Sequence, residues 1–164
     1  MAETNDQNAG GQGTAPAINV LTQYIKDFSF ENPNAPASLR PQDKAPEIDL
    51  QVSVGAKPVA DSEFESELKL TGSAKNGNQV LFAFELIYAG IFRMKDIPAD
   101  QLHPVVMIEC PRLLFPFARQ IIADAVRNGG FPPLYMDPID FVALYRQQAE
   151  QAQKGAQNEN KVVN

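Results

Sequence analysis

Residues 79–89 read QVLFAFELIYA, a run that is apolar at nearly every position and carries one charged side chain, Glu85. A strand that is apolar on both sides is typical of a central position in a sheet. Asn76-Gly77, just before the run, favours a two-residue hairpin, because both central positions of a type I′ turn need a positive φ. The run is therefore predicted to be a central strand, paired antiparallel with the strand before it.

Three more strands are predicted from the alternation of apolar and polar residues, which has a period of two in a strand. They cover residues 18–31, 47–55 and 62–74. One side of the first strand would carry Ile18, Val20, Thr22, Tyr24, Lys26, Phe28 and Phe30. The prolines of residues 32–36 end this strand, because proline has no backbone N–H to donate, and a crossing loop follows to about residue 45.

Carboxylates gather on one side of this sheet if the apolar sides of the four strands coincide. The opposite side then has little more than Lys69 as a basic residue. Its acidic residues are Asp27, Glu31, Glu47, Asp49, Glu63, Glu65, Glu67 and Glu85. The whole chain has a net charge of −6. One face of the sheet is therefore predicted to be acidic and to suit a basic protein partner. Nucleic acid is not expected as a partner, because it needs clustered Lys and Arg.

After residue 92 the apolar period changes to that of an amphipathic helix. The helical stripe consists of Leu114, Phe117, Ala118, Ile121, Ile122 and Ala125. Residues 128–130, Asn-Gly-Gly, supply a stop signal, while Pro111 and Pro116 mark a start or a kink. Phe115 and Val126 lie beside the stripe and, together with Ile122, widen its apolar face. One sheet cannot cover so wide a face, so a closed homo-oligomer is predicted.

A second helix is predicted after the apolar, proline-stiffened connection of residues 131–136. Asp137 would be its N-cap, Pro138 its first residue, and Asp140 would lie beside its positive end. The predicted fold class is therefore α+β. It has a four-stranded antiparallel sheet, with a long amphipathic helix and a C-terminal helix packed on one face. The chain therefore forms two layers, and the protein is expected to be oligomeric.

The length of 164 residues suits one domain, predicted here over residues 18–153. Residues 1–17 and 154–164 are predicted to be flexible tails, because they bury too little apolar surface to offset their ordering entropy. The GGQG of residues 10–13 is part of the first tail, since no strand precedes it and no Lys-Ser/Thr follows. Neither a secretory signal nor an apolar run of about 20 residues occurs, so we expect a cytoplasmic protein without membrane insertion.

The sequence contains few residues that could bind a metal or act as a catalytic nucleophile. Cys110 and His103 are the single cysteine and the single histidine of the chain. Zinc sites and Ser-His-Asp triads need more such residues, and a lone cysteine is most simply a small buried apolar residue. No cofactor, metal or catalytic residue is therefore predicted, and the chain is not expected to be an enzyme.

Two carboxylate pairs keep an acid/base hydrolase open as an alternative: Asp137 with Asp140, and Glu63 with Glu65. Acid/base pairs need burial that separates two pKa values. Helix capping explains the first pair more simply, and solvated strand neighbours explain the second. A general acidic protein-interaction module, which includes proteins that accompany antitoxins or mimic nucleic acid, is a further alternative.

Four segments resemble the SecB family of bacterial protein-export chaperones. They are YIKDFSFENPNAP at 24–36, GIF at 90–92, CPRLLFPFAR at 110–119 and GFPPL at 130–134. The resemblance covers about residues 18–151. It implies a cytoplasmic homotetramer, a dimer of dimers, that holds unfolded precursor proteins without ATP and passes them to the translocation ATPase SecA. A SecB-like branch serves toxin–antitoxin systems, and this client class stays open.

The resemblance also implies roles for individual residues. SecA would be contacted by Asp27, Glu31 and Glu85. Assembly of the oligomer would involve Phe84, Leu86 and Tyr88. The client groove, between the crossing loop and the helix connection, would contain Leu39, Phe131, Pro132, Leu134, Tyr135 and Met136. Alternatively, these last residues simply pack against the final helix.

Overall fold

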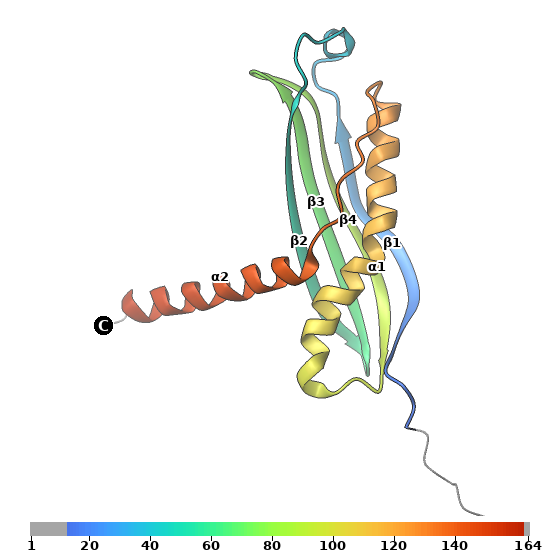
Figure 1. Cartoon of the computed structure of the whole chain (residues 1–164), viewed down its shortest axis with the longest axis vertical. Coiled ribbons are helices and arrows are strands. Elements are labelled where there is room, and N and C mark those ends of the chain that lie inside the picture. The colour runs from blue at the N-terminus through green and yellow to red at the C-terminus, as the bar shows by residue number, and fades with distance from the viewer. Residues whose placement is uncertain (1–12, 163–164) are drawn as a thin grey trace, which may run out of the picture.

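The computed structural model describes residues 13–162 and contains a sheet, a long helix across it and a second helix that points away (Figure 1). The elements in chain order are β1 Ala17–Glu31, the short 3₁₀ helix η1 Ala37–Leu39, β2 Glu47–Ala60, β3 Glu63–Asn76, β4 Gln79–Lys95, α1 Ala99–Asn128 and α2 Phe141–Val162. The four strands are antiparallel, in the order β1-β4-β3-β2. The predicted α+β class and the central position of residues 79–89 are confirmed.

The β3–β4 hairpin is shifted by one residue from the prediction. Asn76 pairs with Gln79, so the two loop residues are Gly77 and Asn78 rather than Asn76 and Gly77. Gly77 has a φ of +59°, while Asn78 has a negative φ. A positive φ at the first loop position alone is characteristic of a type II′ turn, which favours glycine there.

β1 contains two β-bulges that the period-two pattern does not predict. The register with β4 shifts between Val20 and Thr22, and again between Ile25 and Asp27. Each bulge adds one residue to β1, so the side chains beyond it change faces. Tyr24 therefore shares a face with Asp27, and the prediction that it shares a face with Phe28 is wrong.

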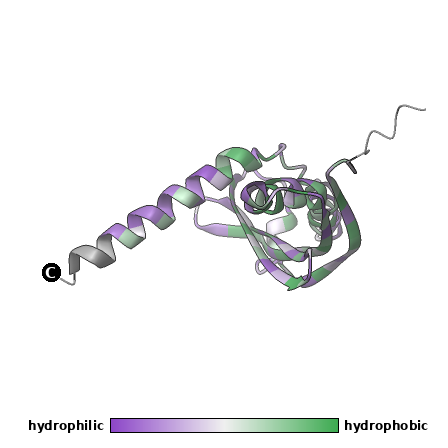
Figure 2. Ribbon diagram, turned by 90° about the horizontal axis from the view of Figure 1, so that it is seen from below, coloured by the Kyte–Doolittle hydropathy of each residue, from purple (hydrophilic) through white to green (hydrophobic). Residues whose placement is uncertain are grey.

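The core lies between α1 and the face of the sheet that we call the inner face; the opposite one is the outer face. The strands curve around α1 when the molecule is viewed along its long axis (Figure 2). Fully buried side chains on the two layers include Leu68, Leu70, Leu86, Phe92, Leu114 and Ile122. Such a core of interlocking apolar side chains supplies most of the stability of a domain of this size.

α1 is rotated relative to the predicted stripe. Phe115, Ile122 and Val126 are buried in the core of the single chain, whereas Phe117 is 52% exposed. The three residues that predicted a second subunit are therefore covered within the chain, and the exposed apolar residues of α1 are Leu113 and Phe117. The helix contains Pro104, Pro111 and Pro116 and bends along its length (Figure 1).

α2 begins at Phe141, three residues later than the prediction implied. Asp140 Oδ1 accepts a hydrogen bond of 3.0 Å from the Ala143 N–H, so Asp140 is the N-cap and the prediction of Asp137 is wrong. Phe141 is buried and makes an edge-to-face contact with Phe115, at 6.2 Å between ring centroids. Beyond this first turn the helix projects away from the sheet instead of packing on it (Figure 1).

The predicted tails correspond only partly to the structure. Of residues 1–17, those before residue 13 lie outside the described residues, and β1 begins at Ala17. At the other end, α2 continues as a helix to Val162. Neither described helix is long and apolar enough to cross a membrane.

Candidate functional site

An apolar groove of about 610 Å³ lies at the end of the sheet where β1 and α1 finish. One wall is the crossing loop between β1 and β2, and the other is the start of the α1–α2 connection. The apolar side chains that line it include Leu39, Ile48, Leu81, Phe82, Phe131 and Leu134. Phe82 stands between Phe30 and Phe131, with ring centroids 6.0 and 5.1 Å away. Two aromatic rings, Phe82 and Phe131, therefore line the groove, and Phe30 stacks on Phe82.

The predicted groove residues are brought together in part. Leu39, Phe131, Pro132 and Leu134 line the groove. Tyr135 is 62% exposed and lies outside the lining, and Met136 is buried in the core, so the prediction is wrong for Met136.

Ile48, Leu81 and Phe82 belong to the groove but were missed. The signal for the last two was in the sequence, because residues 80–82 are apolar directly after the hairpin turn. An apolar strand end next to a turn is adjacent to solvent, and groove walls are formed at such ends. Nothing in the alternation of residues 47–55 distinguishes Ile48 from its neighbours.

Gly130 allows the two walls to approach each other. Its φ is +92°, a conformation that favours glycine, and a Cβ at this position would come within 2.9 Å of Leu39 Cδ2. Leu39 of the crossing loop therefore lies directly over the chain where it leaves α1.

The outer face carries the carboxylates that the sequence predicted there. Glu31 pairs with Ala83, Ser29 with Glu85, and Asp27 with Ile87, and alternate pairs along two strands share a face. Asp27, Glu31 and Glu85 therefore lie on one face, opposite α1. With Asp49, the last two line an open hollow of about 320 Å³ near the groove end of the sheet.

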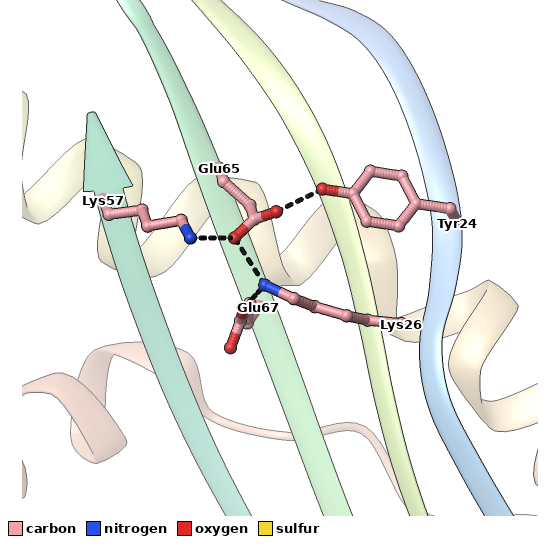
Figure 3. Close-up of polar contacts among 5 residues, drawn as sticks. All are labelled: Tyr24, Lys26, Lys57, Glu65 and Glu67. Atoms are coloured by element: carbon pink, nitrogen blue, oxygen red, sulfur yellow. Dashed lines mark hydrogen bonds and ion pairs between the residues drawn. The ribbon is translucent and has the colours of Figure 1, made fainter. Parts of the chain in front are cut away.

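At the other end of the outer face the carboxylates are neutralised by cations. Glu65, which is only 7% exposed, accepts hydrogen bonds from the Tyr24 hydroxyl and, at 2.9 Å, from Lys26 Nζ. Lys57 Nζ lies 3.3 Å from the same carboxylate, and Lys26 also pairs with Glu67 (Figure 3). The prediction that Lys69 is nearly the only basic residue on this face is therefore wrong. The bulge places Lys26 on this face, and Lys57 lies beyond the predicted end of its strand.

The hydrogen bonds in this cluster shift the acidity of its members. Donation from Tyr24 and Lys26 lowers the pKa of Glu65 to about 2, despite partial burial of the carboxylate. Burial and the hydrogen bond to Glu65 raise the pKa of Tyr24 to about 12. The Glu65 carboxylate is thus ionised at any physiological pH and is held between two lysines.

Two further ion pairs complete the charge pattern of the outer face. Arg93 contacts Glu63 at 2.6 Å, and Lys69 contacts Glu85 at 2.9 Å. Hydrogen bonding to Glu85 and the nearby charge of Asp27 raise the pKa of Lys69. The ion pairs found among the described side chains do not include Asp27, Glu31 or Asp49. Negative charge is therefore concentrated around the hollow near the groove.

Comparison with known proteins identifies the family. The profile of a family described as "Preprotein translocase subunit SecB" matches residues 11–152. The chain belongs to the SecB family. A "Protein-export protein SecB" of Methylocella silvestris is 66% identical over 149 residues, which cover 87% of this chain and 92% of that one. Another, from Beijerinckia indica, is 62% identical over 154 residues, which cover 94% and 92%.

A solved structure shares the SecB fold. It is the SecB-like chaperone of Mycobacterium tuberculosis in complex with a peptide from the HigA1 antitoxin, and it matches with a TM-score of 0.61 at 15% identity. The match covers 75% of this chain and 91% of that one. SecB proteins are chaperones of protein export, and this chain is a SecB chaperone.

The residues predicted at the oligomer interface of this SecB chain are covered within one subunit. Phe84, Leu86 and Tyr88 are 3%, 0% and 9% exposed, because they face α1 from the inner side of β4. Within one subunit, α1 therefore covers these three side chains, and their role in assembly stays a prediction. Tyr88 contacts a surface residue of α1, since its ring stacks on the half-exposed ring of Phe117, with 6.4 Å between the ring centroids. Burial raises the pKa of the Tyr88 hydroxyl.

The side chains considered for catalysis have structural roles in this SecB fold. Burial raises the pKa of the fully covered Cys110 thiol to about 12, which leaves it unreactive at neutral pH. His103 Nδ1 lies 3.0 Å from the Tyr145 hydroxyl and links α1 to α2. Among the side chains that the structure describes, those of residues 13–157, no group of three His, Cys, Asp or Glu is placed to hold a metal ion.

Proposed function

We propose that this SecB chain holds unfolded precursor proteins in its apolar groove and delivers them to SecA through the acidic part of its outer face. The holding step needs no ATP, and the working form is a cytoplasmic homotetramer. The observation that supports this most strongly is the aromatic groove of about 610 Å³, which opens beside, but separately from, the acidic hollow.

The groove suits extended, sequence-diverse chains. Its lining combines aromatic rings and aliphatic side chains with the backbone of the crossing loop, so apolar client residues and client backbone groups both find partners. One such site binds weakly. Several sites along one long client combine through effective concentration, which favours an oligomer that repeats the groove. Binding the unfolded state alone then withdraws it from folding by mass action, without any chemical step.

The acidic hollow suits a basic segment of SecA. Glu31, Asp49 and Glu85 surround it, and charge complementarity mainly accelerates encounter and selects the partner. Because these side chains lie on the outer face and the groove lies at the end of the sheet, one subunit can hold a client and contact SecA at the same time.

Exposed apolar surface supports assembly into an oligomer. β1 is an edge strand whose Val20, Leu21 and Ile25 side chains are 41 to 49% exposed. Long, apolar edge strands are normally covered in the native state. Leu113 and Phe117 add exposed apolar area on α1. We propose that other copies of the chain cover β1 and this part of α1.

A refolding assay tests the holding function. The chain should slow the folding of a denatured precursor with no nucleotide present, and it should not hydrolyse esters or glycosides. Unchanged refolding at chaperone excess would contradict the proposal. If the chain instead preferred an antitoxin peptide to export precursors, it would belong to the toxin–antitoxin branch. That result would disagree with the relatives at 66% and 62% identity, which are named as export proteins.

Charge reversal tests the SecA surface. Glu31→Lys and Asp27→Lys should each weaken SecA binding about tenfold, with client holding unchanged. Asp61→Lys is the matched control, because it makes the same charge change in the exposed turn between β2 and β3. Equal losses in all three variants would show that only net charge matters. Loss of client holding together with SecA binding, in an intact oligomer, would show that the two surfaces are not separate.

A further inference from the structure

The two walls of the groove come from distant parts of the chain, and one side chain joins them. Asn32 follows the last residue of β1 and begins the crossing loop. Its Nδ2 donates a hydrogen bond of 2.9 Å to the carbonyl oxygen of Gly129, where α1 ends. Its Oδ1 accepts a hydrogen bond of 3.0 Å from Ser38 Oγ, in η1 of the same loop. A single amide therefore connects the crossing loop to the other wall.

These hydrogen bonds lie where water has limited access. Ser38 is 1% exposed, and Asn32 is half-buried. The Gly129 carbonyl follows the last turn of α1, where carbonyl groups lack partners within the helix. A buried polar group that loses its partner costs more free energy than an exposed one, so the three groups favour the geometry that satisfies them together.

Apolar contacts across the same junction depend on this geometry. Leu39 of η1 lies over Gly130, and the Phe30 ring lies over Gly129, where an added Cβ would come within 2.7 Å of two ring atoms. These contacts fix how far apart the walls stand, but they have no direction of their own. The Asn32 amide supplies the directional contact.

Other polar contacts of the loop reach the sheet and not the second wall. Asn34 Nδ2 donates a hydrogen bond of 2.8 Å to the Val80 carbonyl oxygen of β4. Asn76 Nδ2 donates one of 2.9 Å to Gln42 Oε1. Asn34 is therefore a matched comparison residue. It has the same side chain in the same loop, but it bonds to the sheet instead of to the end of α1.

We propose that Asn32 is a positioning residue of the client groove, which sets the separation of the two walls by bonding Ser38 on one and Gly129 on the other. This inference rests on the proposed holding function and adds to it a residue that touches no client. Without the Asn32 amide, the crossing loop and the α1–α2 connection move independently, and an extended client is clamped less firmly.

Three substitutions test the proposal. Asn32→Asp keeps the size of the side chain and the acceptor for Ser38, but it places a carboxylate oxygen against the Gly129 carbonyl. Asn32→Ala removes both hydrogen bonds. In both variants, reduced and carboxymethylated α-lactalbumin, which stays unfolded, should dissociate about three to ten times faster than from the wild type. Asn34→Ala should leave the dissociation rate within about twofold, since one exposed hydrogen bond contributes little.

A second measurement decides the proposal without any client. Hydrogen exchange should accelerate at the amides of Ser38 and Leu39 on one wall and of Gly130 and Phe131 on the other, all of which donate backbone hydrogen bonds. The amides of β4 should keep their wild-type protection, and the melting temperature should show that Asn32→Asp is folded. Ser38→Ala, which removes one of the two bonds, is the milder variant if Asn32→Ala does not fold.

The outcomes separate the two proposals. If the wild type binds the unfolded probe, and Asn32→Asp matches Asn34→Ala in both dissociation and exchange, Asn32 does not position the groove. If exchange accelerates in only one wall, the amide stabilises its own loop and does not join the walls, which also overturns the inference. If the wild type fails to bind the probe, the holding function is wrong, and the exchange pattern still decides the role of Asn32.

Discussion

The two faces of β4 differ in what they contribute, although they alternate along one strand. Phe84, Leu86 and Tyr88 point inward and are buried under α1, while Glu85 and Ile87 point outward and are half-buried. Inward residues stabilise the chain by leaving water. Outward residues gain little from burial and are free to carry charge. The difference shows how a central strand can support folding with one set of side chains and recognition with the next.

The largest expected effect on stability comes from truncating a residue on the inner face of β4, compared with its neighbour on the outer face. Leu86→Ala should lower the free energy of unfolding by about 2–5 kcal/mol, because Leu86 is fully buried and the substitution leaves a cavity. Ile87→Ala, one residue on, should cost about 1 kcal/mol, because only part of its surface leaves water. Urea unfolding at equal protein concentration measures both, since oligomers gain stability with concentration. Equal costs would show that the outer face is also covered in the native protein.

Glu65 is the outer-face residue for which we expect the largest cost. Glu65→Gln should lower the free energy of unfolding by about 1–2 kcal/mol, because the nearly buried carboxylate accepts charge-assisted bonds from β1 and lies near Lys57 of β2. The pKa of this group is about 2 when folded, below its ordinary value of 4.5. Its stabilisation is therefore present above about pH 4.5 and is lost as the pH falls towards 2. Unfolding measured from pH 6 to pH 2 should show the difference between wild type and variant shrinking. A constant difference would contradict the shifted pKa.

Lys26 should matter less than the carboxylate that it contacts. Its side chain is 37% exposed and water screens its charge, so Lys26→Met should lower the free energy of unfolding by less than Glu65→Gln does. Lys57→Met is the control: Lys57 contacts the same carboxylate but is 62% exposed and lies outside the bulge. A double-mutant cycle with Glu65→Gln measures each coupling, and the coupling of Lys26 should be the larger. Equal couplings would mean that the bulge adds nothing to the pair.

The smallest effect on stability is expected at Glu85. Its pair with Lys69 is exposed on both sides, so Glu85→Gln should change the free energy of unfolding by less than about 0.5 kcal/mol. SecA affinity should nevertheless fall, and added salt should weaken the wild type more than the variant, because exposed charges are screened. A titration at low and at high salt checks both statements. Identical salt dependence would exclude Glu85 from the contact.

The sequence predicted the central strands well, because the pairing of β3 with β4 shifts only once, between Ala74 and Lys75, next to the hairpin turn. In β4, apolar residues and one hairpin turn identify the strand and its neighbour. β1 is different, since neither bulge has a sequence signal: Lys26 is an ordinary strand residue, and the prediction assumed no inserted position. On α1, Leu113, Leu114, Phe115 and Phe117 are all apolar, so spacing alone cannot tell which three- or four-residue steps face the sheet.

The candidate site was predictable to a similar extent. The carboxylates of one strand face follow from alternation, and the register places Asp27, Glu31 and Glu85 together. Their neutralising partners depend on tertiary positions that spacing does not contain. Tyr135 and Met136 illustrate the same limit in the groove. They are adjacent apolar residues in an irregular connection, and only the packing of α1 decides that Met136 is buried.

The projecting α2 determines how far this molecule can reach. Its 22 residues span about 33 Å as a helix and about 70 Å if the same residues are extended. A helix held at its base must rely on its own hydrogen bonds, and Gly155 lowers helix propensity by about 1 kcal/mol relative to alanine. The distal turns therefore unwind at lower cost than the first turn, whose Phe141 packs in the core, and each residue that unwinds adds about 2 Å to the reach of the arm.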